Sequence, residues 1–270
     1  MEHEASWSYA EVWDKFPIPA RPCNKELEIL EKEIRSLMDR QNNLNILILG
    51  STIEYRSLSK KLGLNPVLVD FSKENFESLS HYSKEKFENE TFEQNDWLKI
   101  SDENKYDVIL GHRPFNVIEA KGLGDFFLVM FKALKPGGVF FCRGNTKPGS
   151  YISTLEESLA KWAFAENREN PLFSYLEVEL YFYCADKDGY VNYEKARNLI
   201  DTWYKAEKLN KKDYDLCRLL VSMSDDARFR GLVDELEIKN SYEKVGFKEV
   251  EWFRCGHEFG KYMPIIKMIK

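Results

Sequence analysis

The sequence predicts an α/β fold with a doubly wound, mostly parallel sheet, and three observations lead to this prediction. Short apolar runs alternate with segments of helical period between positions 45 and 145. The first run, residues 46–49, is apolar at every position, which is typical of a strand covered by helices on both faces. It ends at Gly50, and about twenty residues later a second apolar run ends at Asp70.

Capping residues set the expected ends of these elements. An amphipathic helix is expected over residues 24–40, with Asn24 as its N-cap. Ser51 and Glu54 fit the S-x-x-E capping box, which predicts a helix directly after the first strand. The free N–H groups of that helix would face an anionic group. The expected strands are residues 45–49, 67–69, 91–94, 106–110 and 139–143, and further helices are expected over 53–62, from 73 onward and over 126–134.

The region beyond the fifth strand is longer than such a sheet requires. About 30 residues would suffice before a final pair of strands, whereas residues 144–246 lie there. Residues 175–184 alternate apolar and polar side chains, which favours a strand, and a helix continuing from residues 152–165 is the alternative. The last two strands are expected at 247–254 and 262–269. We therefore expect an N-terminal arm and helix (1–44), a core (45–145 and 244–270) and an insertion that forms a substrate lid (146–243).

The composition argues against several classes of protein. Of the 270 residues 43% are hydrophobic, so the chain is expected to fold around a large core. A formal net charge of -6 argues against a broad nucleic-acid-binding surface. The five cysteines have no C-x-x-C pair and the four histidines have no metal-ligand spacing, which predicts reduced thiols and no metal site. The first residues do not resemble a signal peptide and no apolar run reaches the roughly 18 residues of a membrane span, so we expect a soluble, cytoplasmic protein without a membrane partner.

The residues at the strand ends form a recognisable series. Its members are Leu49-Gly50, Asp70, Asn95-Asp96-Trp97, Tyr106-Asp107-Val108-Ile109-Leu110-Gly111 and Leu134-Lys135-Pro136-Gly137-Gly138. In this order they resemble class I S-adenosylmethionine-dependent methyltransferases, over residues 45–145 and the last two strands. The resemblance implies a Rossmann-like seven-stranded sheet, mostly parallel with an antiparallel C-terminal edge strand. It also implies S-adenosyl-L-methionine as the cofactor.

The turn after the first strand departs from the common pattern of that family. Its glycine-rich motif is reduced here to Gly50. The chain is similar to a subgroup with a Leu-Gly-x-Thr-x-Glu turn, in which Thr52 and the capped helix supply polar contacts. A turn so poor in glycine also counts against the dinucleotide fingerprint G-x-G-x-x-G, which leaves a nicotinamide enzyme as the second choice among enzymes.

The resemblance implies a set of cofactor contacts, with Asp70 at the ribose and Asp96 at the adenine amine. His112 directly follows the fourth strand, at the edge of a parallel sheet where ligands bind. We expect His112 to act as a catalytic base, and a pocket residue without a proton role is the alternative. The expected cofactor-binding residues are Gly50, Ser51, Thr52, Glu54, Asp70, Phe71, Asp96, Trp97, Gly111 and His112.

Two segments outside the sheet are expected to close over a substrate. The N-terminal arm carries apolar Trp13, and its Arg21 could meet a carboxylate, while the insertion supplies Trp162, Tyr181 and Tyr183. A closed site with aromatic walls suits a small organic acceptor with an oxygen or nitrogen nucleophile. The alternatives are a non-catalytic S-adenosylmethionine-binding protein of the same fold and a nucleic-acid or protein methyltransferase. The expected substrate-contacting residues are Trp13, Arg21 and Phe115.

Overall fold

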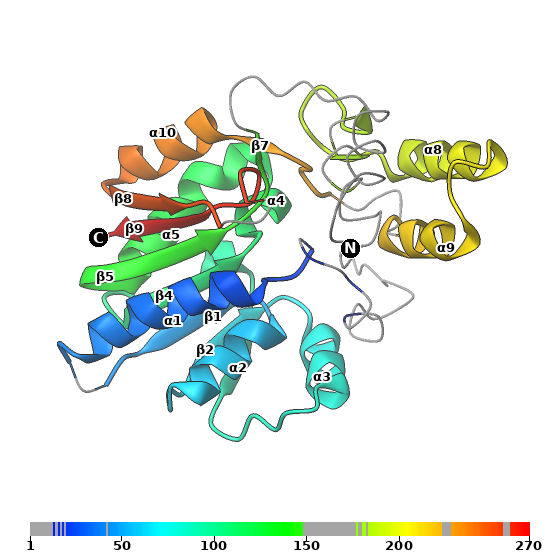
Figure 1. The fold of residues 1–270 in the computed structure, drawn as a ribbon. Coiled ribbons are helices and arrows are strands. Elements are labelled where there is room, and N and C mark those ends of the chain that lie inside the picture. The colour runs from blue at the N-terminus through cyan, green and yellow to red at the C-terminus, as the bar shows by residue number, and fades with distance from the viewer. Residues whose placement is uncertain are drawn as a thin grey trace.

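A seven-stranded sheet forms the centre of the molecule (Figure 1). The computed structural model describes residues 13, 16, 18, 20–41, 43–147, 177, 180, 181, 183–222, 228–255 and 260–270. The strands of the sheet are β1 (Ile46–Leu49), β2 (Val67–Asp70), β3 (Thr91–Gln94), β4 (Tyr106–His112), β5 (Leu134–Arg143), β8 (Lys248–Phe253) and β9 (Ile265–Ile269). Their order across the sheet is β3-β2-β1-β4-β5-β9-β8.

The direction of the strands confirms the expected fold class. The first five strands along the chain pair in parallel, while β9 is antiparallel to both β5 and β8. The sheet is therefore mostly parallel, with antiparallel pairing at its C-terminal edge. Its helices are α1 (Asn24–Met38), α2 (Ile53–Lys61), α3 (Lys73–Tyr82), α4 (Pro114–Val117), α5 (Leu123–Ala133), α8 (Tyr193–Lys205), α9 (Lys211–Leu220) and α10 (Glu235–Val245), with short 3-10 helices η2 (Trp97–Lys99) and η3 (Ala120–Gly122).

Helices cover both faces of the sheet, as the wholly apolar first strand predicts (Figure 1). Leu47 and Leu49 belong to an apolar core shared with α5 and α10. Ile46 and Ile48 point to the opposite face, where they join the apolar side chains of α1 and α2. The alternation of β1 thus divides the interior into two cores, and the carboxyl ends of the parallel strands face the side on which α8 and α9 lie (Figure 1).

The start of α1 differs from the prediction. The helix is capped by Cys23, not by Asn24, which is its first residue. The backbone N–H of Cys23 donates to Oε2 of Glu26 at 2.6 Å. Glu26, at the third helical position, thus reaches back to the cap as the acid of a capping box does.

The capping box predicted for α2 is wrong. The N-cap is Thr52, and its side chain makes no capping hydrogen bond. The Ser51 hydroxyl instead donates to Oδ2 of Asp70 at 2.9 Å, and the Glu54 carboxylate accepts from Nε1 of Trp13 at 3.2 Å. Both side chains therefore serve contacts with distant segments, because a buried carboxylate and an indole N–H each require a partner.

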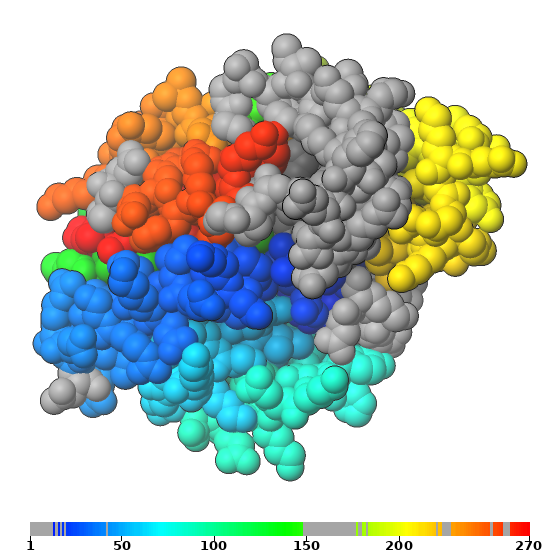
Figure 2. Space-filling view, viewed as in Figure 1, coloured from blue at the N-terminus to red at the C-terminus, as the bar shows by residue number. Residues whose placement is uncertain are grey.

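The insertion contains helices with a core of their own. Helices α8 and α9 pack around Ile200, Trp203 and Cys217, and they form a projection at one end of the molecule (Figure 2). The strand favoured for residues 175–184 is wrong, because the residues described there between 177 and 183 are helical. Their burial follows a helical period. Glu177, Leu180 and Cys184 have exposed fractions of 1%, 1% and 0%, while Tyr183 is exposed.

A small second sheet joins the two ends of the insertion. Strand β6 (Thr146–Lys147) pairs in parallel with β7 (Val233–Asp234). The pairing brings residues that follow β5 beside those that precede α10. Trp162 lies outside the described residues. In the part of the chain that the structure describes, no helix has the length and apolar character of a membrane span.

Candidate functional site

A cavity of about 330 Å³ lies where β1, β2 and β4 end. Its walls come from three parts of the chain that are distant in sequence. The sheet edge contributes Leu49, Gly50, Ser51, Thr52, Asp70, Phe71, Asn75, Leu79, Trp97, His112, Arg113 and Val117. The N-terminal arm, meaning the residues before α1, contributes Trp13, Phe16 and Ala20, and the insertion contributes Glu177, Tyr181, Tyr193, Arg228 and Phe229.

The turn after β1 has the backbone conformation that favours glycine. Gly50 has φ +85°, in the left-handed region, and its N–H donates to the Val69 carbonyl at 2.8 Å. A Cβ at this position would lie 3.5 Å from the Trp97 ring and 3.8 Å from Oδ2 of Asp70, which are ordinary contact distances. The backbone angle, not a lack of space, therefore accounts for glycine at this turn.

Asp70 is a buried carboxylate with part of its hydrogen-bonding capacity left. Its exposed fraction is 2%, and Oδ2 accepts from the Ser51 hydroxyl at 2.9 Å and from Nδ2 of Asn75 at 3.4 Å. Oδ1 accepts from the N–H of Ser72 at 3.1 Å. Burial raises the pKa of Asp70 above its usual value, and these donors oppose the rise. Since a carboxylate accepts about four hydrogen bonds, about one acceptor position remains.

Two aromatic side chains line the cavity together with this carboxylate. Phe71 is 72% exposed although it lines the cavity, and the Trp97 indole is held by a 2.7 Å hydrogen bond from Nε1 to the Val69 carbonyl. Asp96 caps η2 by accepting from the N–H of Leu98 at 3.0 Å. The cavity walls include Phe71 and Trp97 but not Asp96, Glu54 or Gly111, so the predicted cofactor residues are only partly brought together.

His112 is the last residue of β4, and both of its ring nitrogens have neighbours. Nε2 lies 3.1 Å from the Ala20 carbonyl, and Nδ1 lies 3.5 Å from Nη1 of Arg143. A carbonyl only accepts and a guanidinium only donates, so the proton belongs on Nε2. Burial lowers the pKa of His112 well below its usual value, and Arg143 and Arg113 lower it further. The ring is therefore neutral and presents no free lone pair, which does not favour the expected role as a base.

The arm is fastened beside this edge by Glu54. The carboxylate pairs with Nε of Arg21 at 3.2 Å and also accepts from the indole of Trp13. Nη1 of Arg21 donates to the Trp13 carbonyl at 3.0 Å. Arg21 thus meets a carboxylate as expected, but the carboxylate belongs to the protein. Of the three expected substrate contacts, Trp13 lines the cavity, whereas Phe115 is fully buried in the core and does not.

Comparison with known proteins gives a match in structure alone. No family model and no curated protein matches the sequence. A protein from Pyrococcus horikoshii has a TM-score of 0.55 at 15% identity, with 97% of each chain covered. An S-adenosylmethionine-dependent methyltransferase from Methanosarcina mazei has a TM-score of 0.50 at 12% identity, over 85% of this chain and 93% of that one. The CMeT domain of the citrinin polyketide synthase has a TM-score of 0.52 at 14% identity, over 90% of this chain and 51% of that one.

This is the class I methyltransferase fold. The chain spans about half the length of the citrinin synthase chain that it matches, where the covered share is 51%. At identities of 12% to 15% these likenesses establish the fold, and the chemistry has to be argued from the site.

Sequence reasoning missed a buried pair that joins this methyltransferase fold to its insertion. Arg113 follows β4 with φ +56°, and its Nη2 donates to Oε1 of Glu177 at 2.8 Å. The Tyr181 hydroxyl donates to the same oxygen at 2.9 Å. Local sequence gives no signal for such a pair, because its members are 64 residues apart.

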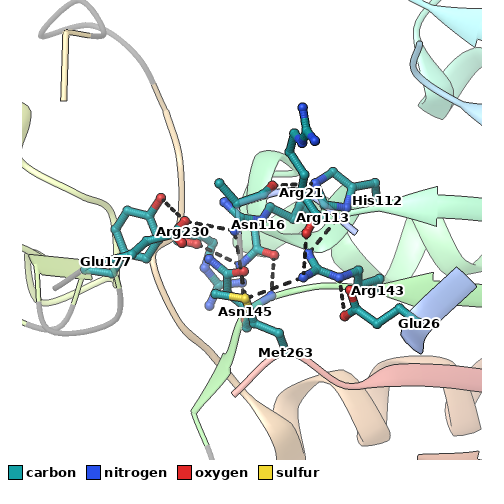
Figure 3. Close-up of polar contacts among 12 residues, drawn as sticks. Arg21, Glu26, His112, Arg113, Asn116, Arg143, Asn145, Glu177, Arg230 and Met263 are labelled. Atoms are coloured by element: carbon teal, nitrogen blue, oxygen red, sulfur yellow. Dashed lines mark hydrogen bonds and ion pairs between the residues drawn. The ribbon is translucent and has the colours of Figure 1, made fainter. Parts of the chain in front are cut away.

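Sequence reasoning also missed a group of polar contacts beside His112 and Arg113 (Figure 3). The Asn116 side chain donates to the Asn145 and Arg230 carbonyls at 3.1 and 2.8 Å, and it accepts from the N–H of Asn145 at 2.9 Å. Nearby, Nε of Arg143 donates to Oε1 of Glu26 at 2.6 Å, and both side chains are fully buried. These contacts fix α1, β5 and both ends of the insertion around the cavity.

Proposed function

We propose that the protein transfers a methyl group from S-adenosylmethionine to a small organic acceptor. The observation that carries this proposal is the shared cavity at the carboxyl ends of β1 and β2. Gly50, Ser51, Asp70 and Phe71 line one side, and aromatic side chains of the arm and the insertion line the other. In doubly wound sheets this edge is where ligands bind. A site of this form suits a ligand with a ribose and a flat base.

The residues present fit that cofactor. Asp70 retains about one acceptor position for a ribose hydroxyl, and the largely exposed ring of Phe71 offers a surface that an adenine base would cover. Trp97 completes the adenine side, and the Gly50–Thr52 backbone with the first turn of α2 faces the carboxylate end. Asp96 caps η2 and does not line the cavity, so its contact with the adenine amine stays a prediction from the family resemblance. When bound, the cofactor supplies an electrophilic methyl group on its sulfonium. We assign Glu54 to holding the arm, because it contacts Trp13 and Arg21 and does not line the cavity.

The chain itself contributes positioning and exclusion of water. Trp13 and Phe16 of the arm and Tyr181 and Phe229 of the insertion enclose the acceptor side of the cavity. Holding two reactants in line in a water-poor site supplies much of the rate of such a reaction. We infer that the insertion acts as the substrate-side cover through its residues before α10, because α10 packs against the sheet with α5. We also infer that His112 positions the arm through the Ala20 carbonyl.

Two alternatives remain in competition with this proposal. A non-catalytic protein that binds the same cofactor is favoured by one observation, the engagement of both nitrogens of His112. A nucleic-acid methyltransferase is disfavoured by the net charge of -6, and polymers in general need an open groove.

Turnover of methyl-labelled cofactor tests the proposal. The purified protein is incubated with S-adenosylmethionine and a pool of small metabolites, and labelled product and demethylated cofactor are measured. We expect both to form in equal amounts, with Asp70→Ala reducing their rate at subsaturating cofactor. Cofactor binding without transfer to any pool would support the binding protein, and absence of binding would contradict both.

A further inference from the structure

The Glu177 carboxylate in the cavity wall has one oxygen in use and one without a partner. Its side chain is 1% exposed, and Oε1 accepts from Nη2 of Arg113 and from the Tyr181 hydroxyl. Oε2 is buried and makes no hydrogen bond to any residue that the structure describes. A buried acceptor without a donor costs free energy. Because Glu177 is one of the residues that line the cavity, a ligand bound there is the partner that could supply the missing donor.

The charges around this cavity disfavour a positively charged acceptor. Arg113 balances the charge of Glu177 at 2.8 Å, and Arg228 adds an exposed guanidinium at the cavity wall, held 4.2 Å from the centre of the Tyr190 ring. His112 adds no charge, because burial and the neighbouring arginines lower its pKa well below the usual value. An ammonium group near Glu177 would therefore face a carboxylate whose charge Arg113 already balances, and it would be repelled by that guanidinium, whereas a neutral O–H or N–H group would not.

The surrounding walls are flat and apolar. The Tyr181 and Phe229 rings lie 5.3 Å apart between centroids and are inclined at 49°. Tyr193 and Phe16, which are almost fully buried, line the same cavity. Aromatic walls of this kind pack well against an aromatic ligand.

We propose that Glu177 orients an uncharged aromatic acceptor by accepting a hydrogen bond at Oε2 from an O–H or N–H group of that acceptor. The inference rests on the proposed function and names the substrate class of the same site. Arg113 and Tyr181 hold the carboxylate by Oε1, which leaves Oε2 as the position for the acceptor. Glu177 is in this account a residue that touches substrate and fixes its orientation.

Binding of three matched probes tests the inference without requiring turnover. The probes are 2-naphthol, which is a neutral donor, 2-methoxynaphthalene, which lacks the donor, and protonated 2-(aminomethyl)naphthalene, which is a cationic donor. Affinities are measured by calorimetry with S-adenosylhomocysteine present at saturation. Because a hydrogen bond to a charged acceptor is involved, we expect 2-naphthol to bind at least about tenfold more tightly than either other probe. Equal affinity of all three, or tightest binding of the cation, would overturn the inference.

The variant Glu177→Gln ties the preference to this side chain. Arg113 and the Tyr181 hydroxyl both donate to Oε1, so the amide oxygen is expected there and the NH₂ group takes the position of Oε2. A donor then faces the hydroxyl of 2-naphthol, and the preference over 2-methoxynaphthalene should fall below about threefold. Glu194→Gln makes the same charge change at an exposed position in the first turn of α8 and should retain the preference.

The outcomes separate this inference from the proposed function. If the wild-type protein does not bind S-adenosylhomocysteine, the proposed function fails. If the cofactor binds but 2-naphthol has no advantage, the inference alone fails. Retention of the full preference in a folded Glu177→Gln protein also overturns it. The wild-type probe series decides the matter even where the variant does not fold.

Discussion

Apolar packing stabilises the sheet, whereas charged groups attach the segments that cover its ligand-binding edge. The cover consists of the N-terminal arm and the described residues of the insertion that precede α10. In the sheet, apolar side chains such as Ile46 and Ile48 are fully buried in contact with other apolar groups. The cover is joined to the sheet edge by buried charged groups. Glu26 of α1 pairs with Arg143 of β5 and accepts from the N–H of Cys23 at the end of the arm, and Arg113 pairs with Glu177 of the insertion. Apolar packing is non-directional, whereas these pairs require one geometry.

The directional contacts are therefore found next to the cavity, where the positions of the arm and the insertion matter most. A buried ion pair adds little net stability over an apolar substitute, but removal of one partner is costly. Such pairs at the cavity therefore hold the arm and the insertion in one position. The following variants test how strongly this region depends on them.

Glu26→Ala should have the largest effect on stability. The change removes the carboxylate that pairs with fully buried Arg143 at 2.6 Å and that also accepts from the N–H of Cys23. We expect a loss of about 3–5 kcal/mol in the free energy of unfolding, measured by denaturant titration. Glu31→Ala is the control, since Glu31 pairs with Lys61 and Arg35 at the surface and should change stability little. A loss at Glu26 as small as that of the control would contradict the role of the buried pair.

His112 should make the free energy of unfolding decrease at acidic pH. Its pKa is lowered well below its ordinary value of 6.5 in the folded protein, so below that pH the unfolded chain binds the proton more readily. Stability should therefore fall as the pH falls below about 6.5, by at most about 1.4 kcal/mol per pH unit from this group. His112→Gln keeps a donor for the Ala20 carbonyl but gains no proton, so the fall between pH 7 and pH 5 should be shallower.

The same variant distinguishes a positioning role from that of a base. Loss of a general base typically lowers turnover by about 10²–10⁴-fold, whereas a positioning residue replaced by a similar donor should lose far less. We expect His112→Gln to retain turnover within about tenfold and to leave the pH profile unchanged in shape. If turnover instead falls by about a hundredfold or more while cofactor affinity is unchanged, His112 acts as a base and not as a positioning residue.

Asp70→Asn should have the smallest effect on stability. Burial raises the pKa of Asp70 above its ordinary value of 3.8, so the contribution of this group to stability is lost as the pH rises through the folded pKa. At pH 7 the buried charge is therefore unfavourable, but the amide NH₂ group cannot accept the hydrogen bonds that one of the two oxygens receives. The two effects oppose each other, so the melting temperature should change little. A clear decrease would show that the charge supports the fold. Cofactor affinity should fall in the same variant.

The two regions also differ in how far the sequence predicts them. The strands of the sheet follow local patterns, so the apolar run at 46–49 and the alternation of buried faces are readable without any distant contact. The cover depends on contacts between segments far apart. Ser51 and Glu54 looked like a local capping box, yet their partners lie 19 and 41 residues away. The hydrogen bonds of Ser51 and Glu54 to these distant segments take the place of the expected local capping contacts.

The helix that contains Glu177 shows the same limit. Its sequence alternates apolar and polar residues. This pattern favours a strand whose polar, outward-facing side includes Glu177. In the structure the carboxylate is buried and paired with Arg113, so the inward face is set by positions 177, 180, 181 and 184. Periodicity cannot identify a buried charge whose partner lies 64 residues earlier in the chain.

Calorimetric titration with S-adenosylmethionine tests the central claim most directly. We predict one-to-one binding to the wild-type protein and at least about tenfold weaker binding to Asp70→Ala, because the ribose loses a charged acceptor. Asp102→Ala is the matched control, since this acid lies before β4 at the opposite edge of the sheet, paired with Lys105 at 3.0 Å. Its affinity should equal that of the wild type. No binding to the wild type, or equal affinity in Asp70→Ala, would contradict a cofactor site at the ends of β1 and β2.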